Sequence, residues 1–162
     1  MDAEKQLREK ERCDIYGQST ETNVRASFMK VADKFFEDPI GVGISSDLSL
    51  AEFLQQKINK SIIDHLWIDN YEKKFELLNE FTASQGTTMF RNDITAVCQI
   101  NAEFFKDVPE TEEKFGPFLA KILQNSDYLP FLTSKNNGNT IHLFLINSHD
   151  EACVSKYLAR KC

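Results

Sequence analysis

Apolar residues that recur every three or four positions are the feature that most constrains what this chain can fold into. That spacing places them on one stripe of an α-helix, where they can face a core. The chain has 13 phenylalanines, most of them at this spacing, and core packing explains them better than a ligand cage. The pattern predicts an all-α fold, a bundle of about five to seven helices, from the segments 23–37, 49–67, 70–86, 88–108 and 110–125.

Signals for helix ends accompany these segments. Pro39 should end the first helix, and Pro109 should close or kink the fourth. Asp47 or Ser49 can cap the second helix, and Glu52 stands three residues after Ser49, the spacing of a capping box. These signals support a helical interpretation of the segments between them.

The apolar run 141–146 is open to two interpretations, because a run this short suits either a strand or the start of a buried helix. A single strand would have no partner, so a helical C-terminus continuing through residues 151–160 is favoured, with room for one short extended segment. Residues 1–20 are expected to form a charged helix or tail. Residues 21–162 are expected to form a single helical domain.

Charge and hydropathy exclude some partners. The net charge is −6 and no cluster of Lys and Arg is present, so we expect no nucleic-acid partner. No apolar run approaches 18 residues, so we expect no membrane-spanning segment. The N-terminus lacks the apolar core of a signal peptide. We therefore expect a cytoplasmic protein.

The four cysteines predict neither a metal site nor a disulfide framework. They are widely and irregularly spaced, at Cys13, Cys98, Cys153 and Cys162. No pair has CxxC spacing, and no histidine stands at metal-ligand distance along the chain. Free thiols in a reducing compartment are the expected state.

The local signatures of common enzymes are missing. The chain contains no Walker A loop, no GxGxxG, no HExxH and no GxSxG. His65 follows Asp64 directly, and adjacent residues on a helix do not face each other, so His65 is expected on a helix surface. His142 and His149 lack a third ligand at suitable spacing. We expect no metal and no cofactor.

One stretch resembles a known family. The matching segments are 71–78, Thr88-Met89-Phe90-Arg91, 104–106 and 116–119, within a stretch of about 50 residues. Together they resemble the first half of a Ras GTPase-activating domain, in which a polar turn leads into a Thr-Leu-Phe-Arg segment.

The resemblance implies a helical domain that binds a small GTPase and contributes an arginine finger. Arg91 would be that finger and so the catalytic residue, with Phe90, Thr88 and Asn92 contacting the partner. Charge develops on the phosphate oxygens during GTP hydrolysis, and an arginine supplied in trans speeds the reaction by roughly 10³ to 10⁵. Lysine could supply the charge but not the planar fork of donors.

A second function from a different class stays open. The family's second half carries a Phe-Leu-Arg segment, where this chain has only Phe131-Leu132-Thr133. Asp93 also places a carboxylate two residues after Arg91. Whether the chain is an enzyme is therefore undecided. The alternative is a non-enzymatic α-helical module that binds some other protein partner.

Overall fold

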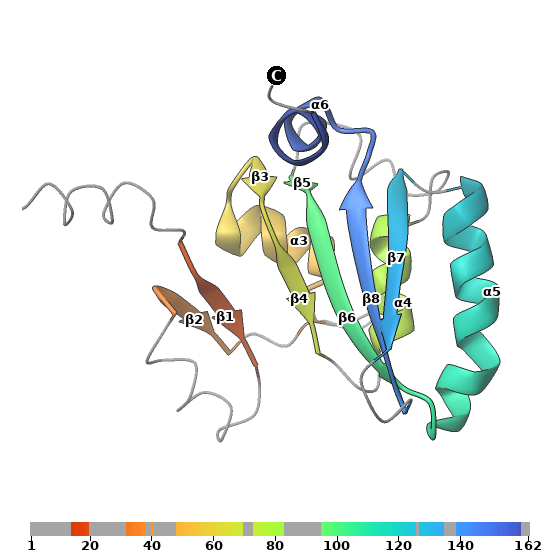
Figure 1. Ribbon diagram of the computed structural model, residues 1–162. Helices are drawn as coiled ribbons and strands as arrows, with labels where there is room; N and C mark the ends of the chain where they lie inside the picture. The colour runs from red at the N-terminus through yellow and green to blue at the C-terminus, as the bar shows by residue number, and fades with distance from the viewer. Residues whose placement is uncertain are drawn as a thin grey trace, which may run out of the picture.

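The fold is a mixed α/β fold, not the helical bundle that the sequence predicted. The computed structural model describes residues 14–19, 32–37, 40, 48–69, 73–82, 95–125, 127–134 and 139–159. A four-stranded sheet forms its centre, and helices cover one face of that sheet (Figure 1). Within these residues, no helix is long and apolar enough to cross a membrane.

The central sheet has the strand order β4-β6-β8-β7. Strand β4 (Leu66–Ile68) runs parallel to β6 (Gln99–Phe105). Strand β8 (Thr140–Asn147) lies antiparallel to β6 on one side and to β7 (Tyr128–Ser134) on the other. The middle of the sheet is therefore formed by the two long strands β6 and β8.

Two helices pack on one face of this sheet. Helix α4 (Lys74–Thr82) lies on the connection from β4 to β6, as a parallel pair requires, and α5 (Pro109–Asn125) lies on the connection from β6 to β7. Their apolar stripes meet the inward side chains of β6 and β8. Buried residues at this contact include Phe75, Leu78, Ile100, Phe104, Phe118, Ile122, Leu143 and Leu145.

Smaller elements surround the central sheet. Helix α3 (Leu50–Phe53) widens into the π-helical turn η1 (Leu54–Ile58), and both contribute buried residues to the core. At the C-terminus, α6 (Glu151–Cys153) continues as a second π-helical turn, η2 (Val154–Leu158). Two short parallel pairs complete the fold: β1 (Tyr16–Gln18) with β2 (Lys34–Phe36), and β3 (Ile62–Ile63) with β5 (Ala96–Val97).

The second predicted helix begins as expected but is shorter. The capping box is confirmed: the Ser49 side chain accepts from the Glu52 backbone N–H, and the Glu52 carboxylate accepts from Ser49 N. The helix ends at Ile58, because Asn59 has the left-handed conformation, φ 52°. The predicted extension to residue 67 is wrong, since residues 62–63 and 66–68 are strands.

The predicted helix at 88–108 is also wrong where the structure describes it. Residues 96–97 and 99–105 are strands, and burial in β6 alternates with a period of two. Ile100, Ala102 and Phe104 face the helices, whereas Asn101 and Glu103 face away. Positions 100 and 104 fit a helical stripe and a strand equally well, so their spacing did not distinguish the two.

The C-terminal run 141–146 belongs to strand β8, so the helix favoured there is wrong, whereas residues 151–158 are helical, within the predicted 151–160. The expectation that a strand here would have no partner is wrong, because β8 pairs with β6 on one side and with β7 on the other. Two other helices are confirmed: α4 lies within the predicted 70–86, and α5 matches 110–125, with Pro109 as its first residue. Of the predicted tail at residues 1–20, the structure describes residues 14–19, in which residues 16–18 form β1.

Candidate functional site

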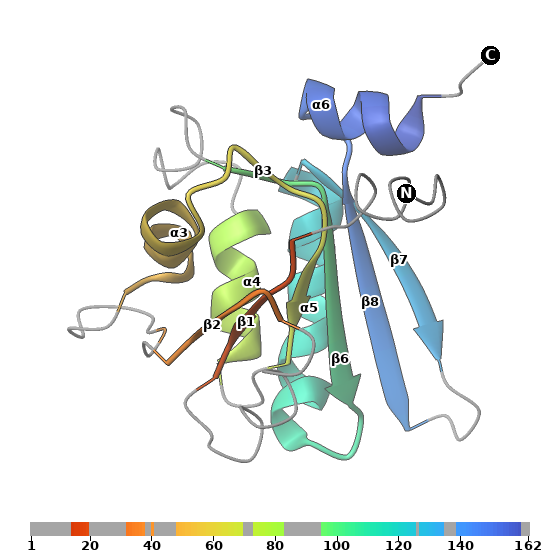
Figure 2. The same ribbon diagram turned by 90° about the vertical axis from the view of Figure 1, so that its left-hand side faces the viewer.

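The sheet face opposite α4 and α5 is the candidate functional surface. In Figure 2, helices α3, α4 and α5 all lie on one side of the sheet, and none of them covers the other side. We call the side that these three helices leave uncovered the open face. Alternation along the strands assigns twelve described residues to it: Trp67, Gln99, Asn101, Glu103, Phe105, Leu129, Phe131, Thr133, Thr140, His142, Phe144 and Ile146.

Large apolar side chains are exposed on the open face. Trp67, the only tryptophan of the chain, is 58% exposed, Phe131 is 48% exposed and Leu129 is 46% exposed. The strand register places Trp67, Asn101, Phe144 and Phe131 in one row across the four strands. The rings of Phe131 and Phe144 touch, with centroids 6.3 Å apart. The row therefore has aromatic groups at both of its ends.

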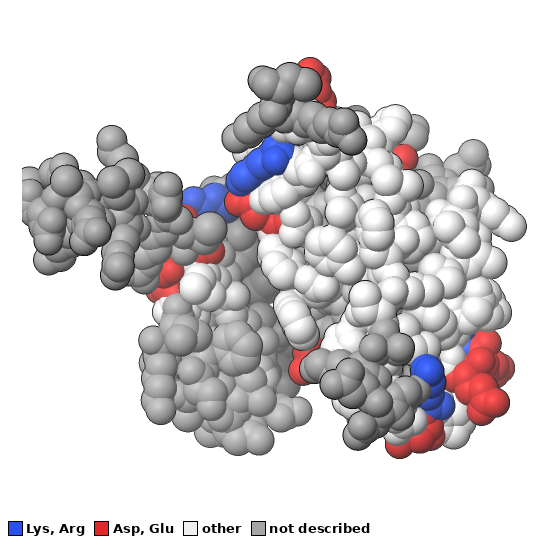
Figure 3. Space-filling model, viewed as in Figure 1, with Lys and Arg blue, Asp and Glu red and all other residues white. Residues whose placement is uncertain are grey.

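Charged groups are scarce on the open face. Charged residues make up 27% of the chain, which would place about three among twelve positions, and Glu103 is the single one there. Its Oε1 lies 3.3 Å from His142 Nε2, without hydrogen-bond geometry. Figure 3 shows the face as a mostly white surface, with charged side chains near its margins. Depletion of charge with retention of aromatic groups is typical of the centre of a protein interface.

Strand β8 carries the sequence signal for this surface. Ile141, Leu143 and Leu145 point toward the helices, while Phe144 and Ile146 point to the open face. A strand that is apolar on both sides is typical of a sheet covered on both faces. The run 141–146 thus contained the information, but a helical interpretation of it hid the alternation.

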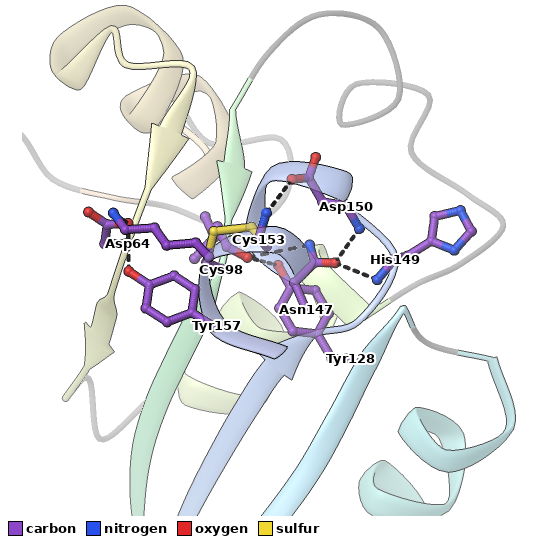
Figure 4. Close-up of a disulfide and its surroundings, with 10 residues drawn as sticks. Asp64, Cys98, Tyr128, Asn147, His149, Asp150, Cys153 and Tyr157 are labelled. Atoms are coloured by element: carbon purple, nitrogen blue, oxygen red, sulfur yellow. Dashed lines mark hydrogen bonds and ion pairs between the residues drawn. A yellow bond between two sulfur atoms is a disulfide. The ribbon is translucent and has the colours of Figure 1, made fainter. Parts of the chain in front are cut away.

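A disulfide joins the C-terminal helix to the sheet, so the prediction of free thiols is wrong for two of the four cysteines. Cys98, between β5 and β6, is bonded to Cys153 of α6, and both are fully buried (Figure 4). The partners are 55 residues apart in the sequence, and only the fold brings them together. Cys13 and Cys162 lie outside the described residues.

The polar side chains near this disulfide form hydrogen bonds with the backbone (Figure 4). The buried Tyr128 hydroxyl donates to Val97 O at 2.8 Å, and burial raises the pKa of this phenol. Asn147 Oδ1 accepts from the backbone N–H of His149 and of Asp150, and Asp150 in turn caps α6 through Cys153 N. These contacts stabilise the turn between β8 and α6, and they leave Tyr128 and Asn147 a structural role.

An ion pair also attaches the C-terminal turn η2 to Asp64, between β3 and β4. Asp64 Oδ1 accepts from Lys156 Nζ at 2.5 Å and from the Tyr157 hydroxyl at 2.6 Å. The hydrogen bond from Lys156, followed by that from Tyr157, lowers the pKa of Asp64, and burial is the largest cause of the raised pKa of Tyr157. This carboxylate is held by a lysine and is not poised as a general base.

Lys74 is the one buried lysine among the described residues. Its Nζ donates to the backbone carbonyl of Glu103 and lies 5.4 Å from the centroid of the Phe104 ring. Burial lowers the pKa of this amine. The amine makes both contacts, with the carbonyl and with the ring, on the covered side of the sheet, so it does not reach the open face.

The predicted arginine-finger site lies outside the described residues, which include none of Arg91, Phe90, Thr88 and Asn92. His65 is described and exposed, as predicted, although on a strand connection and not on a helix; its ring contacts the Asn101 side chain. Among the described residues, no group of three or more His, Cys, Asp or Glu could hold a metal ion.

Comparison with known proteins adds no family. No protein-family model, no curated protein and no solved structure matches the chain. A function for this chain must therefore be inferred from the geometry of the open face.

Proposed function

We propose that this chain is a non-enzymatic protein-interaction domain that binds through the open face of its sheet. The observation that carries the proposal is the half of the central strand β8 from Leu143 to Ile146, which is apolar on both sides although α3, α4 and α5 cover only one. Sheets with two apolar faces are covered on both sides in stable folds. A bound protein supplies the second cover.

The exposed side chains can contribute substantially to binding. Completing the burial of Leu129 or Phe131, each about half exposed, contributes roughly 1 kcal/mol. Trp67 is larger, and tryptophan is enriched among the residues that dominate interface energies. Together these groups can support binding without any charged contact.

Nucleic acid is a poorer candidate for the open face. Aromatic side chains on a sheet can stack on bases, but phosphate binding needs lysine or arginine beside them. None of the twelve residues of the open face is a lysine or an arginine. A protein partner fits this surface better.

Activation of a small GTPase stays a prediction that the described residues do not test. Arg91 is outside them, and the helical scaffold that the resemblance implied is not the fold observed. A cytoplasmic location stays a prediction as well. The disulfide counts against this location, because disulfides are rare in reducing compartments.

Site-specific photo-crosslinking tests the proposed function. A photoreactive side chain at Leu129 on the open face should give a protein adduct in a lysate of the native source, and Trp67→Ser should abolish it. The matched control is Leu123, which is 67% exposed on α5, on the other side of the sheet. Equal adducts at positions 129 and 123, or an adduct insensitive to Trp67→Ser, would refute the proposal.

A further inference from the structure

We propose that the protein bound to the open face is a second copy of this chain, so that two sheets pack face to face in a symmetric dimer. The inference rests on the proposed function and names its partner. Three observations support it: the edges of the sheet, the size and charge of the open face, and the order of its side chains.

The edges of the sheet are poorly suited to association. In β7, every second residue counted from Asp127 directs its backbone groups toward β8, because Asp127 O accepts from Ser148 N. The residues between them direct their backbone groups to the free edge of the sheet. Pro130 is one of these, and it has no N–H that could pair with a further strand. At the opposite edge, β4 is only three residues long. Two copies therefore cannot extend the sheet easily, and the face remains as the contact surface.

The dimensions of the open face favour a sheet over a single helix. Four strands about 4.8 Å apart span a width of roughly 19 Å, and the three longer ones, β6, β7 and β8, give a length of roughly 23 Å. A helix is about 10 Å wide and would cover half of that width. On the covered face, two helices, α4 and α5, pack side by side to cover the same width. An equal sheet covers the whole surface at once, at the usual spacing of about 10 Å.

Charge favours a second copy over a partner of opposite charge. Each copy carries a net charge of −6, so two copies repel wherever acidic surfaces meet. The open face has one carboxylate, Glu103, with His142 beside it. Contact there brings the fewest like charges together. This surface offers a strongly charged partner few groups of opposite charge to bind.

The order of the side chains is self-complementary. A twofold axis parallel to the strands, passing between β6 and β8, superposes β4 on β7 and β6 on β8 of the other copy. Trp67 then lies opposite Phe131 of the second copy, because both stand in the same row. In the next row, Glu103 lies opposite His142 of the second copy, and the reverse. One axis thus pairs the aromatic groups and places each carboxylate opposite an imidazole.

Sedimentation equilibrium of the full chain tests the dimer. The wild-type protein should be dimeric, and Trp67→Ser should raise the dimer dissociation constant at least about thirtyfold, as expected for an interface anchor. Leu123→Ser removes a similarly exposed apolar group from the other side of the sheet and should leave the dissociation constant unchanged. Circular dichroism of each variant shows whether it has folded.

Cysteine cross-linking tests the symmetry. In a background with Cys13→Ser and Cys162→Ser, a mixture of the Trp67→Cys and Phe131→Cys proteins should form a cross-link between copies when a bismaleimide is added. A bismaleimide is used because sheets about 10 Å apart hold facing thiols too far apart for a direct disulfide. Each thiol adds across one maleimide double bond, so the step needs no oxidant. Either protein alone should not form it, because the axis separates like positions by the width of the sheet.

The outcomes separate this inference from the proposed function. A monomer at every concentration, with Trp67-dependent photo-crosslinking to a different protein, overturns the dimer and keeps the interaction function. A monomer without such an adduct overturns both. A dimer that Trp67→Ser does not weaken, or that cross-links equally through position 67 alone, overturns the proposed arrangement.

Discussion

The two faces of the central sheet differ in burial: α4 and α5 bury one face, and the other is exposed. On the covered face, β6 presents Ile100, Ala102 and Phe104, all nearly fully buried under α4 and α5. On the open face, the same strand presents Gln99, Asn101 and Glu103, with Phe105 at its end, and the other apolar groups come from β4, β8 and β7. The covered face is stabilised within the chain. The open face is apolar enough to bind a partner and polar enough at β6 to remain in contact with water.

The largest difference between the faces should appear in stability. Phe104 is 2% exposed and its ring touches those of Phe75 and Phe115, each at 5.0 Å between centroids. Phe104→Ala should lower the free energy of unfolding by about 3–5 kcal/mol, through lost burial and the cavity left behind. Phe131→Ala on the open face should cost less than about 1 kcal/mol in the monomer. Urea denaturation of the two variants measures the contrast, and equal losses would contradict it.

The disulfide should have the next largest effect. Cys153 is the one described residue of α6 and η2 that is buried, so the bond to Cys98 carries most of the attachment of this segment. Cys98→Ala with Cys153→Ala should lower the free energy of unfolding by about 2–4 kcal/mol. A Cys13→Ser, Cys162→Ser double variant is the control and should retain wild-type stability. Loss of stability in the control alone would show that the bond is elsewhere.

Tyr128 offers a smaller test at the end of the covered face. Tyr128→Phe removes the hydrogen bond to Val97 O and should cost about 1 kcal/mol, because Asn147 Nδ2 also approaches that carbonyl, at 3.5 Å. The folded state keeps the phenol neutral, since burial raises its pKa. That part of the stability is complete below about pH 10 and is lost as the pH rises further, when the unfolded phenol ionises. Above about pH 10, the thermal unfolding temperature should therefore fall less steeply with rising pH in Tyr128→Phe than in the wild type.

Asp64 should give the smallest effect. Its pKa is lowered chiefly by the hydrogen bond from Lys156, so the stabilisation is present above the ordinary value of 3.8 and is lost as the pH falls through the lowered folded value. The side chain is 42% exposed, which limits the contribution to well under about 1 kcal/mol. Asp64→Asn and Lys156→Gln should each remove the same acid-dependent part of the stability, measured by urea denaturation between about pH 5 and pH 3. An undiminished acid dependence in both variants would refute the role of this pair.

Local signals in the sequence predicted local structure well. The capping box at Ser49 and Glu52 and the helix 110–125 are both present, because each depends on residues within one or two turns of each other. The strands were missed for a physical reason: Ile100 and Phe104 satisfy both periods, and only the pairing of β6 with β8 decides between them. Helix propensity and pattern cannot anticipate a pairing between residues about 40 positions apart.

The open face could not be predicted from the sequence for a related reason. Trp67 and Phe131 are 64 residues apart and share a row only because the sheet order brings β4 and β7 to its two edges. The cysteines show the same limit, since Cys98 and Cys153 meet only after the sheet and α6 are placed. The motif at Arg91 remains a prediction, because it lies outside the described residues.

Fluorescence of Trp67 tests the central claim most directly, because it is the only tryptophan of the chain and lies on the open face. We predict that raising the concentration of the wild-type protein shifts its emission to shorter wavelength and reduces quenching by acrylamide, as the indole becomes buried against a second copy. Phe131→Ser should abolish the shift, and Leu123→Ser should preserve it. An indole that stays equally accessible to acrylamide at every protein concentration would contradict the account.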